Sequence, residues 1–146
     1  MLDLEQSIPR LLRESAPWVF EELEFRVVHD EPVLIRSFGN TYCILENALI
    51  GLKFTRDRGE VFLEIAFTTD RSHWWQLSDV FAVLVGVERV PDRSIIGITT
   101  DLRKIYKLLI GRIEASEHEV KSAIQVREAE RAASNLRRYQ APLDAE

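Results

Sequence analysis

The amino-acid sequence predicts an α+β domain: an antiparallel meander of about four strands, with an N-terminal helical segment, a short helix and a long C-terminal helix packed on it. Two runs within residues 49–67 alternate apolar and polar side chains, the period-2 pattern of strands with one buried face. Helical apolar spacing occurs on both sides of the strands, in residues 3–23 and after residue 100. At 146 residues the chain can build one hydrophobic core, so residues 1–146 are expected to form a single domain.

The strongest local prediction is a β-hairpin in residues 49–67. Its strands are separated by residues 56–59, Arg-Asp-Arg-Gly, where Asp57 and Gly59 supply turn chemistry and Gly59 can adopt a positive φ. The alternation places one set of side chains inside the domain. Together with the first tryptophan of the chain, these are the expected core residues: Trp18, Phe54, Leu63, Ile65 and Phe67.

Two further strands are expected before the hairpin. Residues 25–30 and residues 41–46 are short β-like runs, and a two-residue turn joins the second run to the hairpin. We expect irregular edge structure at residues 33–36. After the hairpin, the polar residues 68–72 predict a loop rather than a strand.

Residues 3–23 predict a helical segment in two pieces. Leucine and isoleucine recur there at helical spacing, and Ser7 is a candidate N-cap. Pro9 cannot donate a backbone hydrogen bond, so it either lies in the first turn or kinks the helix. A second helical piece is expected to start near Ser15.

Two helices are predicted after the strands. The short one starts near Ser78, a fair N-cap, and ends at Gly86. The long one is capped by Thr100 or Asp101. Its apolar stripe fails in residues 125–146, so we expect this end to be a weakly packed helical tail.

The length of the last helix bears on oligomeric state. A continuous helix over residues 101–139 would be roughly 58 Å long, whereas a domain of this size is about 40 Å across. Such a helix would overhang the domain, which favours a homodimer formed through it. The alternative is a break near Gly111 or Ser116 that folds the chain back as two helices.

The charge distribution narrows the class of partner. The net charge of −5 argues against nucleic acid as the main ligand, because phosphate binding requires a basic surface. Residues 1–73 carry a net −5 and residues 74–146 carry zero, so any attraction to a basic partner would come from the first half. Because neither a membrane span nor a signal peptide is evident, we expect a cytoplasmic protein with no membrane contact.

The sequence predicts no metal site, no cofactor and no catalytic site. The single cysteine, Cys43, lies in a strand-like run and is expected to be a buried, inert thiol. The three histidines lie far apart without a second ligand at metal-binding spacing. No phosphate-binding loop, nucleophile elbow or His-Glu-x-x-His pair is present, so the protein is not expected to be an enzyme.

Two features are candidates for partner binding. Arg56, Asp57 and Arg58 form the polar tip of the predicted hairpin. This tip is either a solvated charged turn or a recognition site whose arginines contact carboxylates. Trp74 and Trp75 are adjacent in an extended segment, so they point to opposite sides. One of the two is expected in the core, which leaves the other available to a partner.

Residues 25–86 carry the sequence Arg-Asp-Arg-Gly after an apolar strand, followed by a tryptophan and then Leu-Ser-Asp-Val at residues 77–80. In this the chain resembles small uncharacterised bacterial proteins, some of which resemble immunity proteins of toxin systems. The resemblance carries over no catalytic residue. We therefore predict a non-enzymatic protein-binding domain, of the inhibitor or immunity kind, that binds another protein. The alternative is a structural or adaptor subunit that dimerises through the C-terminal helix.

Overall fold

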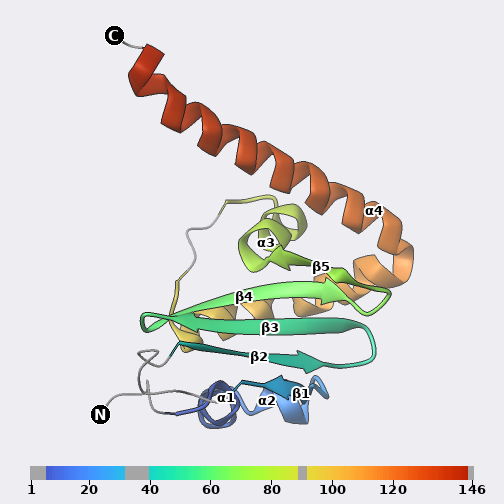
Figure 1. Ribbon diagram of the computed structural model, residues 1–146. Coiled ribbons are helices and arrows are strands. Elements are labelled where there is room, and N and C mark those ends of the chain that lie inside the picture. Colours follow the sequence, from blue (N-terminus) through green and yellow to red (C-terminus); the bar gives the residue numbers. More distant parts are fainter. Residues whose placement is uncertain (1–5, 32–39, 89–91, 145–146) are drawn as a thin grey trace.

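The structure is a computed structural model that describes residues 6–31, 40–88 and 92–144, with side chains described as far as residue 137. Its elements in chain order are α1 (Ile8–Ser15), α2 (Trp18–Glu21), β1 (Arg26–Asp30), β2 (Thr41–Glu46), β3 (Ile50–Asp57), β4 (Glu60–Phe67), β5 (Asp70–Gln76), α3 (Leu77–Val85) and α4 (Ile95–Asp144) (Figure 1). The strands form one antiparallel sheet in the order β1-β2-β3-β4-β5. The predicted meander and α+β class are confirmed, with five strands in place of about four.

The additional strand is β5. The sequence predicts a loop at residues 68–72, but β5 begins at Asp70 and pairs with β4 as far as Gln76. It lies at the edge of the sheet and is polar in its first half, so it lacks the apolar alternation that identifies β3 and β4. The edge structure expected at residues 33–36 lies outside the described residues.

The N-terminal helical segment has two pieces, as predicted. The side chain of Ser7 caps α1 by accepting a hydrogen bond from the backbone N–H of Arg10 at 3.3 Å, and Pro9 lies in the first turn. α1 ends at Ser15, and α2 starts after Pro17 without a side-chain cap. Residues 3–5 of the expected segment lie outside the described residues.

One face of the sheet is covered by α1 and by the first part of α4, which runs behind the strands in Figure 1. Every second residue of the central strands faces this layer and is buried, as strand geometry requires. These residues are Cys43, Leu45, Ile50, Leu52, Phe54, Leu63, Ile65 and Phe67. Four of the predicted core residues are therefore confirmed, whereas Trp18 is only partly buried and packs against the core.

Asn47 fixes the turn between β2 and β3 to the helical layer. Its side-chain oxygen accepts hydrogen bonds from the backbone N–H groups of Leu49 and Ile50, both at 3.0 Å. Its amide nitrogen donates to the backbone oxygen of Leu23 at 3.0 Å and to the hydroxyl of Tyr106 at 2.8 Å. Burial raises the pKa of the Tyr106 hydroxyl. One side chain thus joins the turn to the end of α2 and to α4.

The short helix α3 differs from its prediction only at its start. It begins at Leu77 with no side-chain cap, rather than near Ser78. It ends at Gly86, whose φ of 78° lies in the left-handed region that favours glycine.

The long helix α4 begins at Ile95, earlier than the predicted cap at Thr100 or Asp101. Ser94 accounts for the earlier start, because its hydroxyl oxygen accepts a hydrogen bond from the backbone N–H of Gly97 at 3.0 Å. Thr100 instead lies inside the helix, where its hydroxyl donates to the backbone oxygen of Ile96 at 2.7 Å.

The helix α4 is broken at Ser116, whose φ of −165° and ψ of 97° are not helical. Residues 95–115 pack under the sheet, and residues 117–144 turn away past β5 and α3 and extend beyond the rest of the domain (Figure 1). The break near Ser116, which the sequence left open as an alternative, is the one observed. The argument for a dimer from one continuous helix is therefore wrong, and the dimer itself stays a prediction.

The second part of α4 is held by few apolar and several polar contacts. Val120 and Ile124 are buried. Arg131 donates to both carboxylate oxygens of Asp79, at 3.0 and 3.1 Å, and Asp79 is only 1% exposed. Residues 132–137 make no buried contact and are exposed. None of the helices in the described part of the chain is long and apolar enough to cross a membrane.

Candidate functional site

The face of the sheet opposite the helices is the candidate functional site. We call it the open face, and it carries Tyr42, Ile44, Lys53, Thr55, Phe62, Glu64 and Trp74. All of these side chains are partly exposed. Figure 1 is drawn with this face toward the viewer, and no helix of the described residues lies over it. A sheet face that bears large aromatic side chains and stays uncovered is a candidate contact surface.

The ring of Trp74 lies close to the backbone of β3 at Gly51. A Cβ atom added at Gly51 would lie 3.2 Å from the ring atom Cη2 of Trp74. The next residue, Trp75, faces the opposite side, pairs with Ile65 and is only 2% exposed. The prediction that the two tryptophans point to opposite sides, with one in the core, is therefore confirmed.

Lys53 connects the aromatic side chains of the open face. Its Nζ lies 5.4 Å from the centre of the Tyr42 ring and 6.0 Å from the centre of the Trp74 ring, within the range of cation–π attraction. His29, from β1, stacks on Tyr42 with the ring centres 4.9 Å apart. These contacts link a row of side chains from β1 to β5 over which no helix of the described residues lies.

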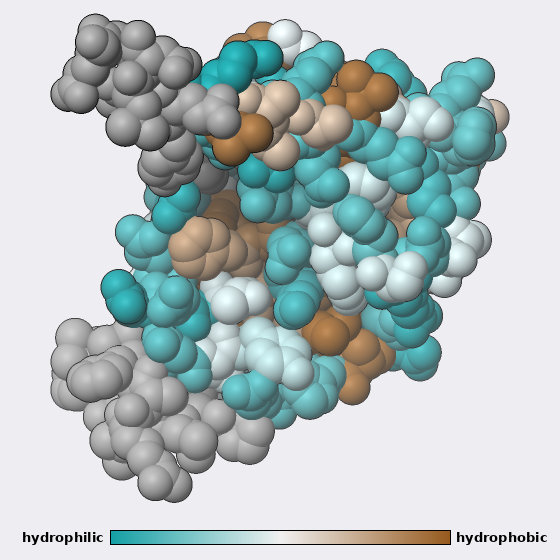
Figure 2. Space-filling view, turned by 45° about the horizontal axis from the view of Figure 1, so that its top comes forward, coloured by the Kyte–Doolittle hydropathy of each residue, from teal (hydrophilic) through white to brown (hydrophobic). Residues whose placement is uncertain are grey.

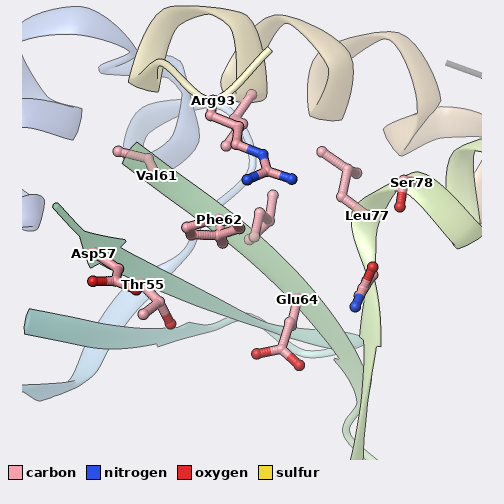
Figure 3. Close-up of a pocket in the computed structure, with 11 residues that line it drawn as sticks. Thr55, Asp57, Val61, Phe62, Glu64, Leu77, Ser78 and Arg93 are labelled. Carbon is pink, nitrogen blue, oxygen red and sulfur yellow. The ribbon is translucent and has the colours of Figure 1, made fainter. Parts of the chain in front are cut away.

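A pocket of about 360 Å³ adjoins the open face at the edge of β4 (Figure 3). It arises because β5 pairs with β4 only between Glu64 and Phe67. Towards the other end of β4, the backbone N–H of Val61 donates to the backbone oxygen of Arg93 at 2.8 Å. The edge of β4 between these two attachments forms the bottom of the pocket. The space-filling view also shows a hollow with apolar (brown) atoms visible among polar (teal) ones (Figure 2).

Arg56 does not lie at an exposed tip. β3 continues to Asp57, which pairs with Glu60, so the loop of the hairpin consists only of Arg58 and Gly59. Arg56 shares the inner face with Phe54 by the two-residue period and is only 3% exposed. Its expected position on a solvated or partner-contacting surface is therefore wrong.

The other two residues of the predicted tip, Asp57 and Arg58, are exposed. Arg58 and Gly59 both have positive φ, 52° and 82°, which is the conformation of a type I′ hairpin turn. The prediction of a positive φ at Gly59 is confirmed. The backbone N–H of Arg58 donates to the side-chain oxygen of Asn40 at 2.8 Å, and Asp57 lines the pocket. A binding role for Asp57 and Arg58 stays a prediction.

Two further titratable groups have shifted pKa values. Burial raises the pKa of the Cys43 thiol to about 12, which agrees with the predicted buried, inert cysteine. Hydrogen bonds from Ser72, followed by the contact with Lys121, lower the pKa of the Asp70 carboxyl. Within the described residues, no group of three or more His, Cys, Asp or Glu side chains is placed to hold a metal ion.

Of the residues of the open face, Trp74 is predicted from the sequence as a candidate binding residue, whereas Tyr42, Lys53 and Phe62 are not. The signal was present, because these residues alternate with Cys43, Phe54 and Leu63, which are predicted or recognisable as inner-face positions. Their alternation with the core predicts a sheet with one buried face and does not by itself indicate a binding surface. Only the arrangement in space shows that they come from neighbouring strands and contact one another.

Comparison with known protein families, with curated proteins and with solved structures found no match to this chain.

Proposed function

We propose that this protein is a non-enzymatic protein-binding domain and that the open face of its sheet is the contact surface. The observation that carries the proposal is the row of partly exposed side chains formed by Tyr42, Lys53 and Trp74, which is preorganised in the unbound protein. Tyrosine and tryptophan are among the residues that most often carry binding energy at protein interfaces.

The physical support is that these side chains lose little freedom on binding. Trp74 rests against Gly51, and Lys53 is held between two rings, so their conformations are already restricted. Ordering a mobile side chain on binding costs about 0.5–1.5 kcal/mol. A preorganised face avoids much of this cost, and it offers an apolar area that a partner can cover.

An inhibitor or immunity protein is the specific role that we propose, because the sequence of residues 25–86 resembles small uncharacterised bacterial proteins, some of which resemble immunity proteins of toxin systems. In this role the open face would cover a functional surface of a partner enzyme, and the partner would lose its activity when bound. The acidic first half of the chain, which includes four of the five strands, favours a basic partner.

A second candidate is an adaptor subunit that dimerises through α4. It is favoured by the exposure of residues 132–137 on the part of α4 that extends beyond the domain, where Leu136 is 59% exposed. Light scattering at micromolar concentration separates the candidates. A dimer that is converted to monomer by Leu136→Glu would support the adaptor, and a monomeric wild type would reject it.

The experiment that tests the proposed surface is affinity capture from cells of the native source. The wild type is compared with Trp74→Ala and with Leu108→Ala, which removes an apolar side chain that is 50% exposed on α4, away from the open face. We expect one partner to be captured by the wild type and by the Leu108 variant but lost with Trp74→Ala. A hot-spot tryptophan accounts for about 2 kcal/mol or more, roughly 30-fold in affinity.

Capture of the same partner by Trp74→Ala, together with its loss in Leu108→Ala, would contradict the proposal. The inhibitor role has its own readout, which is the enzymatic activity of the captured partner with and without this protein. An active partner in the complex would reject inhibition while leaving protein binding in place.

A further inference from the structure

We infer that the pocket beside the open face binds a lysine or arginine side chain presented by the partner protein. This inference rests on the proposed function and specifies the chemistry of the partner. It is carried by the shape of the pocket, by the charges that line it and by its position next to Phe62 and Glu64 of the open face.

The walls of the pocket suit the aliphatic part of a long side chain. Phe62, Leu77 and Ile98 contribute apolar surface from β4, from α3 and from the start of α4. Figure 3 shows Phe62 and Leu77 on either side of the Arg93 guanidinium. Lysine and arginine carry three or four methylene groups that pack on such surfaces while the charged group stays near polar atoms.

The charges in the pocket favour a cation. Its lining includes the carboxylates of Asp57 and Glu64 and one cation, Arg93. Arg93 is already engaged, because its Nη1 donates to Glu60 at 3.0 Å and its guanidinium lies 4.7 Å from the centre of the Phe62 ring. In the described part of the chain, neither Asp57 nor Glu64 has an ion-pair partner within 4.0 Å. An incoming lysine or arginine would supply the missing partner.

The other polar residues of the rim are also suited to a cationic donor. Gln76, Ser78 and Thr55 present side-chain oxygens that can accept hydrogen bonds from an ammonium or guanidinium group. An acidic side chain in the same position would face both carboxylates. A purely apolar side chain would remove the carboxylates from water without a partner, which is unfavourable.

We assign the lysine or arginine side chain to a partner protein because the pocket opens beside the proposed contact surface. Glu64 belongs to both, and its cross-strand neighbour Lys53 lies near the rings of Tyr42 and Trp74. A partner that covers Trp74 and Tyr42 therefore brings its side chains to the mouth of the pocket. The net charge of −5 adds a general attraction for a basic surface.

The test uses small probes that mimic one side chain, so it does not depend on knowing the partner. The probes are N-acetyl-arginine methylamide, its norleucine analogue without charge and its glutamate analogue with the opposite charge. Binding is followed by NMR from the backbone amide shifts of Leu63, Gln76 and Ser78. We expect saturable shifts with the arginine probe, a dissociation constant on the order of 1–10 mM for so small a ligand, and weaker binding as salt increases.

Two variants test whether the carboxylate of Glu64 contributes to binding of the arginine probe. We expect Glu64→Gln to weaken binding of the arginine probe about 1.5- to 5-fold, the range of a partly exposed ion pair. Glu114→Gln removes an exposed carboxylate on α4, outside the pocket, and should leave the binding unchanged. Equal binding of the norleucine or glutamate probe, or no shift with any probe, would overturn the inference.

Binding to the pocket can be tested separately from the proposed contact surface, because Trp74 does not line the pocket. Trp74→Ala should therefore leave binding of the arginine probe unchanged. If no probe binds while Trp74→Ala still abolishes capture of a partner, the pocket is rejected and the contact surface stands. If the probe binds but capture does not depend on the open face, the proposed contact surface is rejected.

Discussion

The two faces of the sheet are built from the same strands and differ in burial. On β2, Cys43 is buried and its neighbour Tyr42 is partly exposed. On β4, Leu63 is buried and its neighbour Phe62 is partly exposed and lines the pocket. The inner face is covered by α1 and α4, whereas no helix of the described residues covers the open face.

Because the open face also carries aromatic side chains, core formation alone does not explain the aromatic residues of this sheet. The inner face can hold the fold together because its side chains are removed from water by a second layer. Those of the open face stay partly exposed, so they contribute less to stability. Tyr42, Lys53 and Trp74 contact one another nonetheless, and this is the observation on which we propose a contact surface.

The largest effect is expected from truncating neighbouring residues on opposite faces. Leu63→Ala should lower the free energy of unfolding by about 2–5 kcal/mol, because it leaves a cavity in the packed inner face. Phe62→Ala should lower it by less, about 1 kcal/mol, because this ring is partly exposed and lines an open pocket rather than the packed core. Denaturant unfolding measures both, and equal losses would mean that the two faces are equally structural.

The two arginines of the predicted tip offer a second comparison. Arg56→Ala should lower the free energy of unfolding by about 2–3 kcal/mol, because removing a buried charged group leaves its polar neighbours unsatisfied. Arg58→Ala, at an exposed turn position, should change it by no more than about 0.5 kcal/mol. A small loss in both variants would show that Arg56 is as accessible as Arg58.

The pH dependence of stability tests how completely the inner face excludes water. The Cys43 thiol has a pKa raised from 9.0 to about 12 in the folded protein by burial. Above pH 9 the unfolded chain loses this proton and the folded protein keeps it, so the unfolded state binds fewer protons and stability falls as pH rises. The slope from this group is about 1.4 kcal/mol per pH unit.

The measurement for this prediction is the free energy of unfolding between pH 9 and pH 11, compared with Cys43→Ala. The variant lacks the thiol, so its stability should decline less steeply over the same range. Identical slopes for the wild type and the variant would indicate a solvated thiol and an inner face open to water.

The smallest effect is expected at Gly51, which lies next to the ring of Trp74. Gly51→Ala places a methyl group 3.2 Å from the Trp74 ring, so the indole has to shift by a few tenths of an ångström. Stability should change by less than about 1 kcal/mol, because the displaced ring is at the surface. The indole N–H resonance of Trp74 should move, whereas that of Trp18 should not. An unmoved Trp74 resonance would mean that the ring does not rest on Gly51.

Much of this arrangement could be predicted from the sequence, and the failures have physical causes. The hairpin strands could be predicted because buried and partly exposed side chains alternate over residues 52–56 and 61–65. β5 was missed because an edge strand with polar residues carries no such alternation. The break at Ser116 could only be named as an alternative, since the residue itself does not require one.

The candidate site was predicted less well than the fold. The burial of Arg56 could not be predicted, because four polar residues separate the two apolar runs in the sequence. In the structure the strands continue through Asp57 and Glu60, and the turn consists only of Arg58 and Gly59. The pocket could not be predicted, because it combines the edge of β4 with Leu77, Arg93 and Ile98, which are distant in sequence. Such combinations depend on tertiary packing.

The most direct test of the open face as a contact surface is photo-crosslinking in cells of the native source. A benzophenone side chain is placed at position 42, on the open face, and in a matched variant at position 108, on the exposed side of α4. The account predicts a discrete crosslinked product with one partner protein from position 42 and none from position 108. A partner crosslinked from position 108 alone, with none from position 42, would contradict it.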